Sequence, residues 1–218
     1  AFNATLDWAL RMTLILIAPA MMGLIVLAKP LLITLFQYGR FTPGDVEAAS
    51  WSLMAYGAGL AGFVLVKVLV PGYFSRQNTR TPVRCAVMAM LVNMVLSISL
   101  VVLWFDSGIA HAGLALATGL AAWVNAGLLY RGLRREGVYK PVAGWSWLMP
   151  RVAVALAGMT AVLLWPAQQV GFWLAQGVLG RTVALAALII AGALVYFLLL
   201  ALLGLRPGAL REPRLENG

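Results

Sequence analysis

The sequence contains few of the residues with which soluble enzymes do chemistry. It has one cysteine, one histidine and seven acidic residues in 218 positions. Charged residues make up 11% of the chain, whereas soluble globular domains carry about 25%, and 62% of the residues are hydrophobic. This composition excludes an ordinary soluble domain and predicts a protein that lies in a lipid bilayer.

The single cysteine and the single histidine do not suggest a catalytic pair. Cys85 cannot form an intrachain disulfide, and a catalytic thiol would need a histidine partner. A whole apolar run separates Cys85 from His111, so we expect the two at opposite membrane faces. The sequence shows no pair of acids deep in an apolar run, no metal-ligand cluster and no nucleophile motif. We therefore predict that the protein is not an enzyme and has no metal cofactor.

Six apolar runs are long enough to cross a hydrocarbon core of about 30 Å, which takes about 20 helical residues. Their continuity does not fit the short alternating strands of a barrel, so helices must satisfy the backbone within lipid. The sequence thus predicts an all-α integral membrane protein with six transmembrane helices within residues 1–205, followed by a tail at 206–218. The predicted spans are Trp8–Ala28, Ala48–Val70, Val83–Phe105, Ile109–Leu133, Trp147–Trp165 and Thr182–Leu203.

The basic residues predict the orientation. The net charge is +9, and the lysines and arginines lie between apolar runs without a stripe of interleaved aromatics, so nucleic acid is not the expected partner. Positive residues mark the cytoplasmic side, which places both termini in the cytoplasm and the arginines near anionic phospholipids. The predicted cytoplasmic connections and tail carry Arg76, Arg80, Arg84, Arg131, Arg134, Arg135, Lys140, Arg151, Arg206, Arg211 and Arg214, with Arg11 at the start of the first span. The opposite side carries Lys29, Arg40 and Arg181.

The segment Gly57–Gly62 reads GAGLAG and matches the dinucleotide fingerprint by letter. That fingerprint needs a preceding strand and an acidic residue about 20 positions further on, and both are missing here. Ala55 with Gly59, and Ala58 with Gly62, instead form small-xxx-small pairs that let two helices approach closely. We interpret the segment as a helix-packing motif.

Polar residues inside two spans have two interpretations. Asn93 lies near the middle of the third span and Ser97 lies one turn further along the same face. Asn125 and Thr118 occupy the fourth span. Such residues either form hydrogen bonds between helices or line a path for a substrate or an ion.

A basic segment follows the second span and reads GYFSRQNTRTPV from Gly72 to Val83. Thr81 and Pro82 predict a helix start, with the threonine as N-cap and the proline in the first turn. Pro71 and Pro82 bracket the segment and constrain its arginines. Lys67 lies about 6 Å before the helix end and can snorkel.

Three stretches resemble one known family: LFQYGRFTPGD at residues 35–45, KVLVPGYFSRQNTRTPV at 67–83, and HAGLALATGLAAWVNAGLLY at 111–130. They are similar to the C-terminal part of the MurJ (MviN) lipid II flippases, of the multidrug, oligosaccharidyl-lipid and polysaccharide exporter superfamily. The resemblance implies fourteen transmembrane helices, of which these six are helices nine to fourteen. The chain opens at Ala1 without an initiator Met, so we expect it to be part of a longer polypeptide.

The resemblance also implies a function. Such proteins move lipid II, the undecaprenyl-pyrophosphate-linked peptidoglycan precursor, from the inner to the outer leaflet of the bacterial inner membrane. The last two helices of the family build a groove for the lipid tail, here Trp147–Trp165 and Thr182–Leu203. The arginines that meet the pyrophosphate lie mainly in the family's first, second and eighth helices, so this chain alone should not flip lipid II.

The candidate site residues follow from both lines of reasoning. We expect Lys67, Arg76, Arg80 and Asn125 on the substrate pathway or at a cytoplasmic gate, where they would contact the missing N-terminal helices or anionic phospholipids. Some relatives bind sodium with an Asn and an Asp one turn apart, together with an acid in an earlier helix. Asn93 matches that Asn, Ser97 replaces the Asp and Thr118 is a possible further ligand, so coupling to sodium or to the membrane potential is open. The alternatives are an exporter of another lipid-linked saccharide and a non-transporting membrane scaffold.

Overall fold

The computed structural model describes residues 2–105 and 109–205. This part of the chain is helical throughout, with no strand. The helices are α1 (Phe2–Val26), α2 (Ala28–Phe36), α3 (Pro43–Leu69), α4 (Pro71–Phe74), α5 (Arg80–Leu103), α6 (Ala110–Arg135), α7 (Trp145–Gln168), α8 (Val170–Ala175) and α9 (Val178–Leu202).

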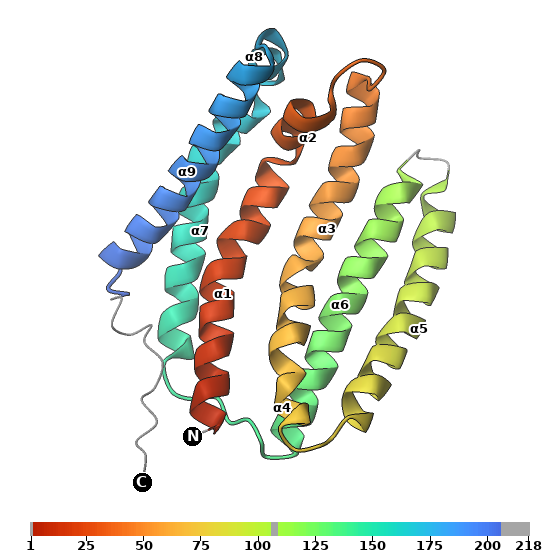
Figure 1. Ribbon diagram of the computed structural model, residues 1–218, viewed down its shortest axis with the longest axis vertical. Coiled ribbons are helices and arrows are strands. Elements are labelled where there is room, and N and C mark those ends of the chain that lie inside the picture. Colours follow the sequence, from red (N-terminus) through yellow and green to blue (C-terminus); the bar gives the residue numbers. More distant parts are fainter. Residues whose placement is uncertain (1, 106–108, 206–218) are drawn as a thin grey trace.

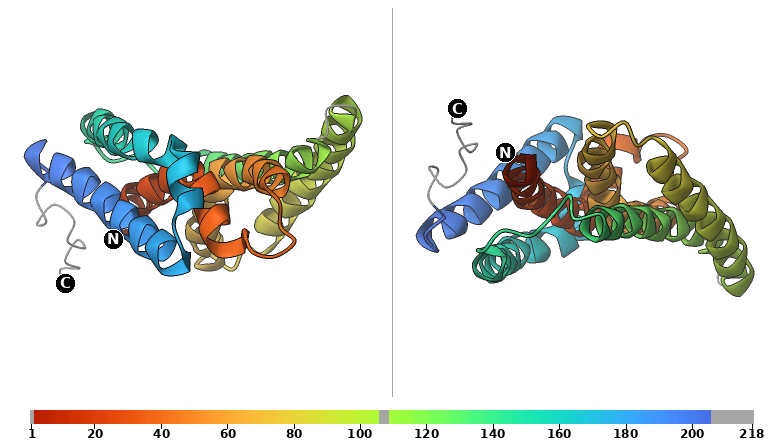
Figure 2. Two further views of the ribbon diagram at one scale, coloured as in Figure 1. Left: turned by 90° about the horizontal axis from the view of Figure 1, so that it is seen from above. Right: turned by 90° about the horizontal axis from the view of Figure 1, so that it is seen from below.

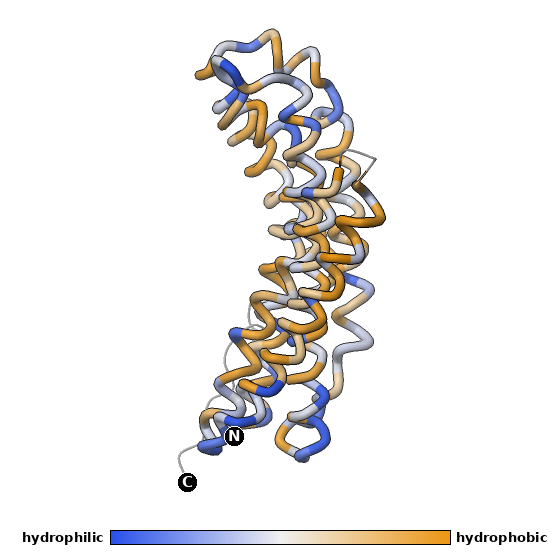
Figure 3. Tube along the Cα trace, turned by 90° about the vertical axis from the view of Figure 1, so that its right-hand side faces the viewer, coloured by the Kyte–Doolittle hydropathy of each residue, from blue (hydrophilic) through white to orange (hydrophobic). Residues whose placement is uncertain are grey.

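Six helical segments are long and apolar enough to cross a membrane: α1, α3 continued by α4, α5, α6, α7 and α9. The shortest have 24 residues, which at 1.5 Å per residue span about 36 Å, more than the hydrocarbon core of about 30 Å. Figure 3 shows the hydrophobic residues along the middle of the molecule and hydrophilic residues gathered toward both ends. The predicted fold class is confirmed, while the predicted tail at 206–218 lies outside the described residues.

The long helices lie side by side in an elongated arrangement (Figures 1 and 2). Helix α6 packs between α3 and α5, α1 packs on α3, and α7 and α9 pack on each other and on α1. The short helices α2 and α8 lie at the end of the molecule away from the N-terminus. We call the other end the basic end; there α1, α5 and α7 begin and α4, α6 and α9 end, and it carries Arg76, Arg80, Arg131, Arg134, Arg135 and Lys140.

Helices α3 and α6 approach each other through glycines. A Cβ atom added to Gly59 would collide with the Cα of Gly119, and one added to Gly62 would lie 2.8 Å from the backbone nitrogen of Trp123. Both positions belong to the GAGLAG segment. Its interpretation as a helix-packing motif is confirmed, and the nucleotide-binding alternative has no strand in the described residues to support it.

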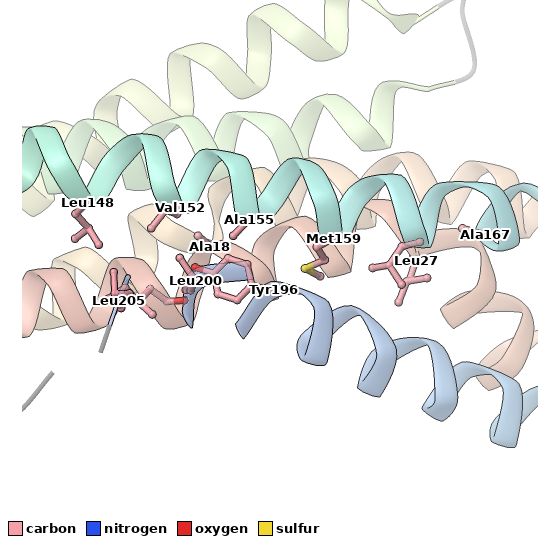
Figure 4. Close-up of a cluster of buried hydrophobic side chains, with 12 residues drawn as sticks. Ala18, Leu27, Leu148, Val152, Ala155, Met159, Ala167, Tyr196, Leu200 and Leu205 are labelled. Atoms are coloured by element: carbon pink, nitrogen blue, oxygen red, sulfur yellow. The ribbon is translucent and has the colours of Figure 1, made fainter. Parts of the chain in front are cut away.

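A cluster of buried side chains joins α1, α7 and α9 (Figure 4). The hydroxyl of Tyr196 in α9 is buried and donates to the backbone oxygen of Ile15 in α1 at 2.9 Å. At the basic end, Nε of Arg151 donates to the Leu203 oxygen at 2.7 Å and so satisfies a carbonyl at the end of α9. These contacts fix the last two spans against the first.

A capping box and an ion pair order the opposite end of the bundle. Thr42 accepts a hydrogen bond from the Asp45 backbone nitrogen at 3.3 Å, and the Asp45 carboxylate accepts from the Thr42 nitrogen at 2.8 Å. This capping box starts α3. Lys29 before α3 forms an ion pair with Glu47 at 2.6 Å, which ties α2 to α3.

Candidate functional site

The basic segment Gly72–Val83 has a fixed backbone. Its first residues form α4, and Tyr73 is buried with its hydroxyl donating to the Leu129 oxygen of α6 at 2.7 Å. The backbone nitrogen of Asn78 donates to the Tyr73 oxygen at 3.1 Å, which closes the loop on itself. The segment is therefore anchored to α6, and its arginines project from a defined position.

The predicted start of α5 is wrong by a few residues. The helix begins at Arg80, and Thr81 is its second residue and not its N-cap. The side-chain oxygen of Asn78 accepts a hydrogen bond from the Thr81 backbone nitrogen at 3.1 Å, and the Asn78 amide donates to the Thr81 hydroxyl at 3.0 Å. The N-cap residue is Thr79, whose side chain makes no capping hydrogen bond. Asn78, one residue before it, supplies the acceptor for the Thr81 nitrogen, so the helix starts earlier than the Thr-Pro signal indicates.

The candidate gate residues lie at the basic end and are exposed. Arg76 Nη1 is 3.5 Å from Glu136 Oε2 at the end of α6, with side-chain exposures of 52% and 36%. A pair this long and this exposed contributes little to stability. Lys67 in the last turn of α3 and Arg80 at the start of α5 are exposed, and neither forms an ion pair with another described residue. All three cations are thus available to a partner.

The polar residues of the spans are only partly brought together. The Ser97 hydroxyl donates to the Asn93 oxygen at 3.4 Å within α5. Thr118 donates to the Leu114 oxygen of its own helix at 2.9 Å, and the Asn125 side-chain oxygen is buried without a partner among the described residues. Asn93 and Ser97 thus bring two neutral oxygens together within α5, and the sodium site stays a prediction.

Sequence reasoning missed a buried polar cluster around Asp7. The side chain of Asp7 is 4% exposed. Its Oδ1 accepts from the Tyr139 hydroxyl at 2.7 Å, from the Trp145 indole nitrogen at 2.9 Å and from the Val142 backbone nitrogen at 3.2 Å. Its Oδ2 accepts from Arg11 Nε at 2.7 Å. The cluster ties the start of α1 to the connection between α6 and α7.

Arg11 and Tyr139 complete the cluster. Arg11 Nη2 donates to the oxygens of Val142 and Ala143, each at 2.9 Å. Burial, with the hydrogen bond to Asp7 as the next cause, raises the pKa of Tyr139, so the phenol stays protonated and donates at physiological pH. The i,i+4 spacing of Asp7 and Arg11 was the only signal in the sequence, because the other partners lie more than 130 positions away.

A cavity of about 590 Å³ opens beside the Asp7 cluster. It lies between α1, α3, α6 and the start of α7. Its lining includes Leu10, Leu65, Trp123, Gly127, Tyr130 and Trp145.

The fold defines a multi-pass helical membrane protein. Within residues 2–105 and 109–205, no group of three or more His, Cys, Asp or Glu side chains could hold a metal ion. A family model described as "Lipid II flippase MurJ" matches residues 1–188. The "Probable lipid II flippase MurJ" of Vibrio cholerae serotype O1 is 48% identical over 205 residues, covering 94% of this chain and 38% of the relative.

Two further comparisons agree. The "Lipid II flippase MurJ" of Burkholderia cenocepacia is 35% identical over 208 residues, covering 94% of this chain and 39% of the relative. A solved structure, "Lipid II flippase MurJ, inward closed conformation", superimposes with a TM-score of 0.72 at 25% identity, covering 93% of this chain and 39% of that chain. The chain belongs to the MurJ lipid II flippase family, as its resemblance predicts, and spans about two fifths of the length of these relatives.

Proposed function

We propose that this chain is the C-terminal lobe of a lipid II flippase, which moves the undecaprenyl-pyrophosphate-linked peptidoglycan precursor from the cytoplasmic to the periplasmic leaflet of the bacterial inner membrane. The observation that carries the proposal is the family match over residues 1–188 together with the superposition on the solved flippase. Alternating exposure of one site needs no bond-breaking group, which fits the side chains described above. The arginines expected to hold the pyrophosphate belong to helices outside this chain.

The basic end supports the orientation in this proposal. Most of the arginines lie at the basic end of the bundle, whereas the opposite end carries Lys29, Arg40 and Arg181. Because positive residues favour the cytoplasmic side, this distribution supports a cytoplasmic location for the basic end, where α1 begins and α9 ends. The lipid tail is assigned to α7 and α9, whose outward faces expose large apolar side chains such as Val154, Leu194 and Leu198. The energy source, sodium or the membrane potential, stays a prediction.

Complementation tests the proposal. A full-length flippase carrying this chain as its C-terminal lobe is expected to restore growth to cells depleted of their own lipid II flippase. The control is the same protein lacking residues 43–135, with insertion of each checked by membrane fractionation. Failure to restore growth despite normal insertion would contradict the proposal. If the protein instead rescued only cells that accumulate another lipid-linked saccharide, the result would favour the alternative exporter.

Arg76 and Arg80 form the second part of the proposal, as residues of the cytoplasmic gate. They are exposed on an anchored backbone at the basic end, so they can meet the upstream lobe or an anionic headgroup without moving the segment. Replacing both by alanine is expected to lower transport at least tenfold at unchanged protein level. The matched control replaces Arg40, an exposed arginine of the opposite end; transport equal to that of this control would remove the gate assignment.

A further inference from the structure

The cavity between α1, α3, α6 and α7 is lined almost entirely by carbon atoms. Four of the lining residues are aromatic and also carry a polar atom. The Trp123 indole donates to the Ala58 oxygen at 2.9 Å. The Tyr139 hydroxyl and the Trp145 indole both donate to Asp7. These polar atoms are already satisfied by the protein, so an occupant of the cavity meets hydrocarbon and ring faces.

Tyr130 is the fourth aromatic and differs from the others. Its hydroxyl makes no hydrogen bond with any residue in the described ranges, and its ring packs edge-on against Tyr139 with centroids 5.6 Å apart. Tyr130 also lines a second pocket of about 380 Å³, whose other residues are Arg131, Arg134 and Arg135. An apolar cavity and a basic pocket therefore share one tyrosine.

One face of α6 connects the two pockets. Trp123, Gly127, Tyr130 and Arg134 follow each other at spacings of four, three and four residues, which places them in one row along a helix. The row runs from the apolar cavity to the basic end, where α6 terminates. Ion pairs do not neutralise Arg131, Arg134 or Arg135 within the described residues, since the nearby Glu136 pairs with Arg76. The pocket presents three positive charges at the end of a hydrocarbon-lined cavity.

We propose that these two pockets bind one anionic phospholipid of the leaflet at the basic end, with an acyl chain in the cavity and the phosphate among Arg131, Arg134 and Arg135. The cavity volume of about 590 Å³ falls within the range of about 300–1,000 Å³ for ligand pockets. Guanidinium groups bind phosphate oxygens in a bidentate manner, and the free Tyr130 hydroxyl lies where chain and headgroup meet. The proposed ligand is thus a phospholipid of the bilayer and not the transported substrate.

The structure offers a substitution that fills the cavity. A Cβ atom added to Gly127 meets no other atom within 4 Å, so a phenylalanine side chain at this position can enter the open space of the cavity. Gly171 in α8 also has nothing within 4 Å of an added Cβ and lies near the other end of the bundle. Gly171→Phe is therefore the matched control for Gly127→Phe.

Native mass spectrometry of the purified full-length flippase carrying this lobe tests the proposal, with phosphatidylglycerol and zwitterionic phosphatidylcholine as the two probes. Gly127→Phe is expected to lower the bound fraction of phosphatidylglycerol more than tenfold, because the phenyl ring displaces several methylenes of the acyl chain from the cavity. Gly171→Phe leaves binding unchanged. Arg134→Gln, which does not touch the cavity, lowers the preference for phosphatidylglycerol about fivefold, whereas Arg40→Gln does not.

Three results would overturn the proposal. The first is equal phosphatidylglycerol binding by Gly127→Phe, Arg134→Gln and the unmodified protein. The second is displacement of the bound phosphatidylglycerol by stoichiometric lipid II, which would assign the cavity to the substrate. The third is a Gly127→Cys variant that forms a disulfide with a cysteine placed in an upstream helix, which would assign the cavity to a protein segment. None of them bears on complementation, so the proposed function is tested separately.

Discussion

Replacing Asp7 with asparagine is expected to destabilise the protein by about 3–5 kcal/mol, the range for removing one partner of a buried ion pair. The side chain of Asp7 is 4% exposed and that of Arg11 is 24% exposed. An asparagine keeps the size of the side chain but removes the charge that Arg11 meets. Its amide group also presents a donor where the carboxylate accepts, so at least one buried hydrogen bond is lost, and the cost of about 1–3 kcal/mol for this loss is part of that total.

The measurement is the free energy of unfolding of the purified protein in detergent, followed by tryptophan fluorescence because Trp145 donates to Asp7. The matched control is Glu47→Gln, which removes an acid from an ion pair at the other end whose side chains are 35% and 50% exposed. An exposed pair contributes at most about 1 kcal/mol. A loss for Asp7→Asn no larger than that for Glu47→Gln would show that the cluster does not hold α1 to the α6–α7 connection.

The second large effect is expected at Gly59, where leucine should prevent α3 and α6 from packing. The Cβ of any larger residue at this position collides with the backbone of Gly119, and a backbone atom cannot turn aside as a side chain can. Overpacking typically costs about 1–3 kcal/mol and sometimes more. We expect the upper end, since two helix backbones would have to separate along an interface that is close-packed on both sides.

Size-exclusion chromatography of detergent extracts after heating gives the apparent melting temperature for this test. Gly59→Leu is expected to aggregate well below the temperature of the unmodified protein. Gly171→Leu, which also replaces a helical glycine but has open space around its added Cβ and does not line the cavity, is the control. Equal melting temperatures for the two leucine variants would mean that loss of a glycine, and not the contact with Gly119, determines the outcome.

The sequence predicts the fold class well because the bilayer restricts the choices. Apolar runs of about twenty residues are expected to form helices in a bilayer, and inside such a run the GAGLAG segment is best explained as a helix-packing motif. The basic segment at Gly72–Val83 is correctly predicted as a connection between spans, whereas the predicted start of α5 and its capping residue are wrong. Asn78 was as visible in the sequence as Thr81, so that error concerns two neighbouring signals of similar strength.

The polar and apolar sites were less predictable. Apart from Arg11, the partners of Asp7 lie 132 to 138 positions away in sequence, and nothing in a single sequence links such distant residues. The cavity beside them is formed by four segments, none of which is unusual alone. Asn93, Ser97, Thr118 and Asn125 were correctly placed within helices, yet their partners depend on helix rotation, which hydropathy does not determine. Thr118 bonds to its own helix, as threonines in helices can.

The most direct test of the proposed function is the transbilayer distribution of lipid II in cells whose only flippase carries this chain as its C-terminal lobe. An enzyme added from the periplasmic side that cleaves exposed lipid II measures the fraction in the outer leaflet. We expect this fraction to match that of cells with their own flippase, and to fall when the gene is repressed. An outer-leaflet fraction that stays at the level of flippase-depleted cells, with the protein correctly inserted, would contradict the assignment.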